Sequence, residues 1–231
     1  MVNLDMIPIA TPSTVDFGST GAPVLLVPRT TLYGRWFKRP IDIVLALVIG
    51  ALLAPLMVLI ALSIPVMLGR GGVIYRQERI GRDGQVFTIY KFRSMLRDRR
   101  ERANLDYAGP ERRQNHKSID DPRHRPYGRF LRATSLDELP QLLNVLKGQM
   151  SMVGPRPELI AVAIREGFAS HPRNMTRPGL TGAFQVSPLR TASRISAGLH
   201  LDIDYVVDVR FGDDLKILAR TLLIPFQRRG R

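Results

Sequence analysis

Two adjacent carboxylates, Asp137 and Glu138, are the side chains of this sequence best placed to do chemistry. They stand in the stretch Ser135-Leu136-Asp137-Glu138-Leu139-Pro140, directly before a leucine-rich segment. A carboxylate can act as a nucleophile and form a covalent intermediate, which divides one difficult displacement into two easier ones. The acidic pair is therefore the first candidate for a reactive centre.

The same residues also fit a structural role at the start of a helix. Ser135-x-x-Glu138 matches a capping box, and the helix dipole favours acidic side chains in the first turn. Pro140 favours a cap at Asp137 instead, because the proline then lies in the first turn, where no backbone donor is required. Residue types alone leave capping and chemistry open as alternatives for Asp137.

The elements around the pair follow from hydrophobic periodicity. Leucines at helical spacing from Leu139 to Leu146 predict an amphipathic helix that ends near Gly148, and further helices are predicted over residues 157–168 and 213–223. The last of these is basic and apolar enough to lie on a membrane surface. Short strands are predicted at 73–75 and 86–90, around a turn at Arg82-Asp83-Gly84. These patterns predict an α+β, mainly helical fold.

Several familiar sites are excluded by composition and spacing. The chain has no cysteine, so disulfides, thiolate metal sites and cysteine nucleophiles are ruled out. It has neither a Gly-x-x-x-x-Gly-Lys-Ser/Thr loop nor a Gly-x-Gly-x-x-Gly fingerprint, which argues against a P-loop nucleotidase and a dinucleotide enzyme. Its four histidines lack the close helical spacing of a zinc protease.

The net charge of +14 indicates an anionic partner, for which nucleic acid, acidic lipid and phosphorylated substrates all qualify. The charge belongs to the part of the chain after residue 28, because Asp5 and Asp16 are the only charged side chains before it. Residues 1–34 are predicted to form a flexible leader without the basic start of a secretory signal. Most of the arginines between Lys91 and Arg132 are assigned to a solvated face.

The run Ile43–Leu68 has 26 residues and no charged side chain, which is long enough for a helix to cross a bilayer. Basic residues flank both ends, and the positive-inside tendency would place both ends on the cytoplasmic side. Pro55, near the middle, makes a sharp bend plausible. We therefore predict a re-entrant membrane helix hairpin over residues 35–69 and a cytosolic catalytic domain over 70–231. A straight span with a mild proline kink is the alternative.

Five motifs occur in the order found in one enzyme family. They are Lys38-Arg39-x-x-Asp42, Gln77-Glu78-Arg79-Ile80-Gly81, Lys91-Phe92-Arg93-Ser94-Met95, the run from Arg132 to Gly148 with its continuation from Met150 to Pro157, and Arg177-Pro178-Gly179-Leu180-Thr181-Gly182. With these motifs, residues 38–226 resemble the polyprenyl-phosphate phosphoglycosyl transferases that have a monotopic membrane anchor.

The resemblance implies roles for individual residues. Asp137 would be the covalent nucleophile, with Glu138 beside it at a Mg²⁺ and proton-handling site. Substrate phosphate or nucleotide would contact six further residues, of which Arg93 and Arg177 could equally be structural ion-pair partners. These six are Lys91, Arg93, Arg132, Arg156, Arg177 and Asp202.

The implied reaction moves a sugar-1-phosphate from a nucleotide sugar, UDP being the nucleotide favoured by the family, to undecaprenyl phosphate. It would release UMP and start the assembly of an exopolysaccharide or glycoconjugate at the cytoplasmic face of a bacterial inner membrane. Membrane lipid is then a partner and nucleic acid is not, while a homodimer stays open.

Two competing hypotheses come from other classes of protein. A basic nucleic-acid-binding protein would explain the +14 charge but not the apolar run, and its binding would weaken steeply with salt. A non-catalytic membrane scaffold would keep the apolar helix and tolerate Asp137→Asn.

Overall fold

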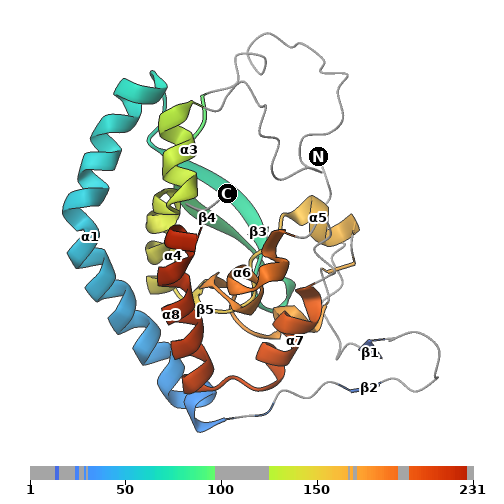
Figure 1. Cartoon of the computed structure of the whole chain (residues 1–231). Helices are drawn as coiled ribbons and strands as arrows, with labels where there is room; N and C mark the ends of the chain where they lie inside the picture. The colour runs from blue at the N-terminus through green and yellow to red at the C-terminus, as the bar shows by residue number, and fades with distance from the viewer. Residues whose placement is uncertain are drawn as a thin grey trace. The chain divides into compact units, whose positions relative to one another are not determined.

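The computed structural model describes residues 14–15, 24–25, 29, 31–96, 125–165, 167–168, 171–191 and 198–227 (Figure 1). The predicted leader lies almost wholly outside these residues, and so does the arginine-rich stretch over 97–124. The strands of the structure are β1 (Thr14–Val15), β2 (Val24–Leu25), β3 (Ile74–Ile80), β4 (Val86–Phe92), β5 (Ser151–Val153) and β6 (Gly179–Thr181).

Helices account for most of the described chain. The α-helices are α1 (Lys38–Leu68), α3 (Pro126–Ala133), α4 (Leu142–Leu146), α5 (Ile160–Arg165), α6 (Ala183–Val186), α7 (Leu199–Val207) and α8 (Phe211–Gln227). A short π-helix, η2 (Tyr33–Phe37), precedes α1. The 3₁₀ turns are η3 (Arg82–Gly84), η4 (Leu136–Gln141), η5 (Pro172–Met175) and η6 (Pro188–Thr191).

The strands form three separate two-stranded sheets among the described residues: β1 with β2, β3 with β4, and β5 with β6. The β5–β6 pair is parallel, with Ser151 opposite Gly179 and Val153 opposite Thr181. A mainly helical fold with short strands was predicted from the sequence, and the structure confirms it.

The chain divides into two compact units. One contains residues 52–75 and 90–140, and the other contains residues 1–51, 76–89 and 141–231. The core of the larger unit gathers Val145 from α4, Met152 from β5, Tyr205 from α7 and Ile217 from α8. The core of the smaller unit consists of Ile60, Ile64 and Leu68 from α1, Phe92 from β4 and Leu131 from α3.

Helix α1 is one unbroken helix of 31 residues that contains both Pro55 and Pro65. The re-entrant hairpin predicted around Pro55 is therefore not shown by the structure. Together with η2, α1 is the one helix of the described chain that is long and apolar enough to cross a membrane. Only 11% of its most apolar 18-residue window is buried, whereas a core helix of a soluble protein would be mostly buried. Composition and exposure together indicate that this helix associates with a membrane.

The two faces of α1 differ in exposure. Ala46, Ile60, Ile64 and Leu68 are buried and share one face, since they are spaced by multiples of helical turns. The opposite face is exposed and apolar along its whole length, with Val44, Val48, Leu52, Leu59, Leu62 and Val66. We refer to these six residues as the exposed stripe. One side of α1 thus packs on protein and the other is available to lipid.

Other boundaries differ from the predictions in informative ways. The two strands around Arg82-Asp83-Gly84 extend over 74–80 and 86–92, and Asp83 has a φ of 54° at the turn. The helix predicted after the acidic pair is instead a 3₁₀ turn followed by the short helix α4, because Pro140 lies within the turn. The helix predicted over 157–168 is limited to Ile160–Arg165, while α8 is longer than predicted.

Candidate active site around Asp137

The acidic pair lies in η4, directly after α3. Helix α3 ends at Ala133, and Thr134 closes it by donating its hydroxyl to the carbonyl of Phe130 (2.8 Å). Ser135 follows with a φ of 59°, in the left-handed region that a non-glycine residue rarely adopts. This residue turns the chain sharply into η4. Such backbone strain is often found at functional sites.

Within the turn, the side chain of Asp137 is buried, with 7% of its surface exposed. The backbone N–H of Glu138 donates to the carbonyl of Ser135 (3.1 Å), as expected for 3₁₀ geometry. The N–H of Ser135, which a capping box would pair with Glu138, donates to the carbonyl of Arg132 (3.3 Å). The geometry does not match the capping box suggested by the sequence.

Glu138 forms an ion pair with Lys91 from the end of β4. The Nζ of Lys91 donates to Oε1 of Glu138 at 2.6 Å, and the two side chains are only 15% and 20% exposed. A charge-assisted hydrogen bond of this length is stronger than a neutral one, and partial burial reduces its screening by water and salt. The structure therefore brings two carboxylates and one cation together within one unit.

The turn rests on the apolar core of its unit. Leu136 and Leu139, which flank the two acids, pack against the cluster formed by Ile60, Ile64, Leu68, Phe92 and Leu131. Ser63 of α1 also forms a hydrogen bond with the hydroxyl of Tyr127 on α3. The second half of the apolar helix is thus part of the support beneath Asp137 and Glu138.

Two predicted arginines lie in the same unit. Arg132 is exposed on the last turn of α3, with Nη1 3.9 Å from the sulfur of Met95. Arg93 donates from Nη2 to the carbonyl of Gly69 (2.6 Å), so it links the end of β4 to the residue that follows α1. Five of the eight predicted site residues, Lys91, Arg93, Arg132, Asp137 and Glu138, therefore belong to this unit.

The other three, Arg156, Arg177 and Asp202, belong to the larger unit. Nε of Arg177 donates to the carbonyl of Gly148 (2.9 Å). Burial is the main cause that lowers the pKa of Arg177, and the neighbouring charges of Arg82 and Arg39 act in the same direction. Arg177 therefore has a hydrogen bond to the backbone of the fold, while its two predicted roles, phosphate contact and ion-pair partner, stay predictions.

Asp202 is paired with an arginine that the sequence did not indicate. Arg173 is almost fully buried and donates from Nη2 to Oδ2 of Asp202 (2.7 Å) and to the carbonyl of Arg156 (3.1 Å). Glu158 lies 3.6 Å from its Nη1. Burial raises the pKa of Asp202 to about 6, against the opposing influence of Arg173. These contacts favour a role for Asp202 in holding the backbone at Arg156.

Arg173 was missed because neither periodicity nor spacing distinguishes it from the other arginines of the chain. Its neighbours Pro172 and Asn174 indicate only a turn. The contacts of Arg173 with Glu158, Arg156 and Asp202 form only when folding brings these residues together.

A Mg²⁺ site was predicted at Asp137 and Glu138. Among the residues with described placement, no three acidic or histidine side chains gather into a metal-binding group. Proteins commonly hold Mg²⁺ through one or two carboxylates together with substrate phosphates and water, rather than in a cage made only of protein. The donor set of the acidic pair therefore fits Mg²⁺ bound jointly with a phosphorylated substrate.

The fold and the site define a chain with a membrane-type helix and a carboxylate centre supported by basic side chains. Comparison with known proteins identifies it more closely, since the family model for bacterial sugar transferases matches residues 33–228. The chain belongs to the bacterial sugar transferase family.

Three similar proteins have names that describe their activity. The undecaprenyl-phosphate galactose phosphotransferase of Salmonella typhimurium is 40% identical over 85% of this chain and 42% of its own length. The UDP-glucose:undecaprenyl-phosphate glucose-1-phosphate transferase of Escherichia coli is 37% identical over 89% of this chain and 44% of its own length. The protein of the same name from Caulobacter vibrioides is 40% identical over 85% of this chain and 71% of its own length. The chain thus spans less than half the length of the first two relatives.

Proposed function

We propose that this protein transfers a sugar-1-phosphate from a UDP-sugar to undecaprenyl phosphate and so starts the assembly of a surface polysaccharide or glycoconjugate. The observation that carries the proposal is the buried Asp137 in a strained turn, next to the Lys91–Glu138 ion pair, in a chain of the bacterial sugar transferase family. Relatives named for UDP-glucose and for undecaprenyl phosphate support this choice of donor and acceptor.

The reaction proceeds in two displacements. A carboxylate oxygen of Asp137 attacks the phosphorus that bears the sugar, and the bond from this phosphorus to the bridging oxygen breaks. UMP leaves with that oxygen and its electron pair, and the sugar phosphate remains on Asp137 as an acyl phosphate. An oxygen of undecaprenyl phosphate then attacks the same phosphorus, which restores the Asp137 carboxylate and gives undecaprenyl-diphosphate-sugar.

Both steps bring anions together, so they need positive charge around the phosphates. Lys91 neutralises Glu138 beside the nucleophile, and Arg132, exposed on the neighbouring α3, can contact the diphosphate. Arg93, Arg156 and Arg177 are further candidates for phosphate or nucleotide contacts. Mg²⁺ held by Asp137 and Glu138 would supply additional charge neutralisation on the phosphate oxygens.

The anchor is proposed to enter and leave the membrane from the cytoplasmic face of the inner membrane. Exposed basic residues flank α1 at both ends, at Arg35 and at Arg70 and Arg76. The second half of α1 also packs on α3 and η4, so a helix that carried this half across the bilayer would take the acidic turn with it. The exposed stripe would face lipid, and the acceptor phosphate would meet Asp137 at headgroup depth.

The test uses detergent-purified protein with Mg²⁺, undecaprenyl phosphate and UDP-glucose or UDP-galactose. We expect UMP release and, without the acceptor, a phosphosugar adduct on the peptide that contains Asp137. Asp137→Asn should abolish both, and Glu138→Gln should lose activity while its thermal unfolding stays close to that of the unaltered protein. Loss of a helix cap alone would cost only about 0.5 to 2 kcal/mol of stability.

Full turnover by Asp137→Asn would contradict the covalent mechanism and favour the scaffold hypothesis. RNA or DNA binding that weakens steeply with salt, without sugar transfer, would favour a nucleic-acid-binding protein. A cysteine at position 1 that an impermeant reagent labels from the periplasmic side of intact cells would contradict the proposed topology.

A further inference from the structure

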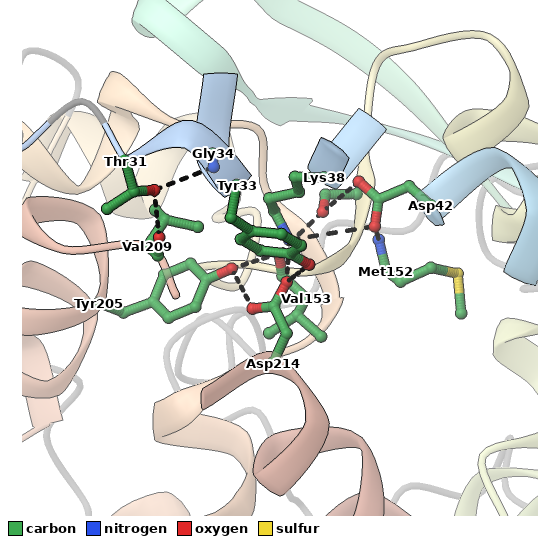
Figure 2. Close-up of polar contacts among 11 residues, drawn as sticks. Thr31, Tyr33, Gly34, Lys38, Asp42, Met152, Val153, Tyr205, Val209 and Asp214 are labelled. Atoms are coloured by element: carbon green, nitrogen blue, oxygen red, sulfur yellow. Dashed lines mark hydrogen bonds and ion pairs between the residues drawn. The ribbon is translucent and has the colours of Figure 1, made fainter. Parts of the chain in front are cut away.

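A buried charged network surrounds the first turn of α1 (Figure 2). The Nζ of Lys38 donates to Oδ2 of Asp214 on α8 at 2.6 Å and lies 4.0 Å from Oδ1 of Asp42, one helical turn further along α1. The hydroxyls of Tyr33 and Tyr205 also donate to Asp214, at 2.6 and 2.7 Å. A single carboxylate of α8 therefore receives three donors, two of them from the chain around the start of α1.

The second carboxylate of the network fixes the same turn to strand β5. Oδ2 of Asp42 accepts from the hydroxyl of Ser151 (2.7 Å), and Oδ1 accepts from the backbone N–H of Met152 (3.0 Å). Asp42 and Asp214 are 3% and 4% exposed, and all four of their carboxylate oxygens have a partner. A buried polar network with its acceptors satisfied is rigid, whereas removal of one charge leaves the others buried and unpaired.

Arg39 connects the first turn of α1 to helix α4 by hydrogen bonds. Its guanidinium donates to the carbonyls of Val145 (2.7 Å) and Leu146 (3.1 Å), which are the last two residues of α4. In the chain, α4 directly follows the acidic turn η4. The first turn of α1 thus contacts α4, β5 and α8 through three neighbouring charged residues, which we call the latch: Lys38, Arg39 and Asp42.

The physical need for a latch comes from the composition of α1. Apart from Ser63, whose hydroxyl contacts that of Tyr127, the side chains of α1 from Ile43 onward are apolar, so rotation or sliding of the helix mainly exchanges one apolar contact for another. Hydrophobic packing is not directional and sets such a register weakly. Buried polar groups are known to fix the register of packed helices, because their hydrogen bonds and ion pairs form in only one arrangement of the helices.

We propose that Lys38, Arg39 and Asp42 are positioning residues that set the rotation and axial register of α1, and thereby place Ile60 and Ile64 beneath the acidic turn. The inference builds on the proposed function, because it assigns a task in phosphosugar transfer to a motif that has no role in the chemistry itself. Helix α1 is continuous from the latch to Ile60 and Ile64, so a register set at its first turn would be carried along the helix to the side chains that contact Leu136 and Leu139.

The variant that tests this is Lys38→Met with Asp214→Asn, which removes the closest ion pair of the network and leaves Asp42 with its hydrogen bonds from Ser151 and Met152. Its matched control is Lys216→Met with Asp213→Asn, which removes an exposed pair at 3.1 Å on the same helix α8. Asp42→Asn, which keeps the shape of the side chain, is a second variant. The chain has no cysteine, so single cysteines for spin labels can be added without background.

The first readout is independent of activity. Nitroxides at residues 59, 60, 62, 64 and 66 are examined for oxygen accessibility in vesicles. We expect low accessibility at 60 and 64 and high accessibility at 59, 62 and 66 in the parent and the control, in accord with the buried and exposed faces. The latch variants should lose this contrast. An unchanged pattern in a folded latch variant overturns the proposal.

The second readout is transfer to undecaprenyl phosphate. A misplacement of about 1 Å can cost about 10²-fold in rate, so we expect a loss of that order in the latch variants and none in the control. If a latch variant loses the difference in oxygen accessibility between the two faces of α1 but transfers sugar phosphate at the parental rate, the latch residues are not positioning residues. If the parent itself transfers no sugar, the proposed function fails, while the accessibility pattern still decides whether the latch sets the register.

Discussion

Replacement of Lys91 by methionine removes the cation that faces Glu138 and keeps a side chain of similar length. In the structure Nζ of Lys91 lies 2.6 Å from Oε1 of Glu138, with both side chains at least four-fifths buried. Without this cation, Asp137 and Glu138 would present two adjacent carboxylates to an anionic diphosphate. We expect Lys91→Met to bind or attack the donor less well rather than to unfold.

The size of the effect follows from the kind of bond that is lost. A hydrogen bond between charged groups contributes about 1.5 to 3 kcal/mol net, more than a fully exposed ion pair. If Lys91 stabilises the charge of the transition state by the same amount, a factor of ten per 1.4 kcal/mol gives an expected loss in kcat/KM of about 10-fold to about 150-fold. Lys91→Arg keeps the charge but not the geometry, and should lie between the parent and Lys91→Met.

The assay is UMP release at varied UDP-sugar concentration, with thermal unfolding measured on the same preparations. Lys147→Met, which removes an exposed lysine after α4, is the control and should keep the parental kcat/KM. An unchanged kcat/KM in a well-folded Lys91→Met would contradict this prediction, because it would show that the ion pair contributes nothing to the reaction.

Three further variants test the structure around the site. A Cβ on Gly128 would lie 1.9 Å from the backbone oxygen of Ser94, so Gly128→Ala should lower the free energy of unfolding by about 1 to 3 kcal/mol or more, measured by denaturant titration. Arg173→Met leaves Asp202 buried without its cation and should cost about 3 to 5 kcal/mol, much of which Arg173→Met with Asp202→Leu should restore. Burial, with the nearby Arg173, lowers the pKa of His171 to about 4 from 6.5, so the unfolded chain takes up a proton in this range that the folded chain does not. Stability should therefore fall as the pH drops from 6.5 to 4, and His171→Asn should show a smaller fall in unfolding curves across that range.

The parts of the fold that the sequence predicted are those set by local patterns. The apolar run over 43–68, the strands on either side of Arg82-Asp83-Gly84 and the final amphipathic helix are each recognisable within one window of residues. The leucine spacing after Asp137 predicts a helix longer than α4, whereas in the structure Pro140 lies in a 3₁₀ turn that precedes the helix.

The contacts that the sequence could not predict join residues far apart in the chain. Lys38 and Asp214 are separated by 176 positions, and Arg173 and Asp202 by 29. Nothing in the local pattern of either residue specifies its partner, because tertiary packing alone brings them together. The Asp137–Glu138 pair was recognised from its motif, but the ion pair with Lys91 became visible only in the structure. The catalytic roles of these residues stay predictions.

The two-faced exposure of α1 has a practical consequence for the production of this protein. Membrane anchors are often deleted to obtain a soluble catalytic domain, on the assumption that anchor and domain fold separately. Here the removal of residues before 69 would take Ile60, Ile64 and Leu68 out of the core that also contains Leu131 and supports Leu136. The helix is a structural part of the domain as well as its proposed membrane anchor, so a truncated chain would expose apolar surface directly beneath the acidic turn.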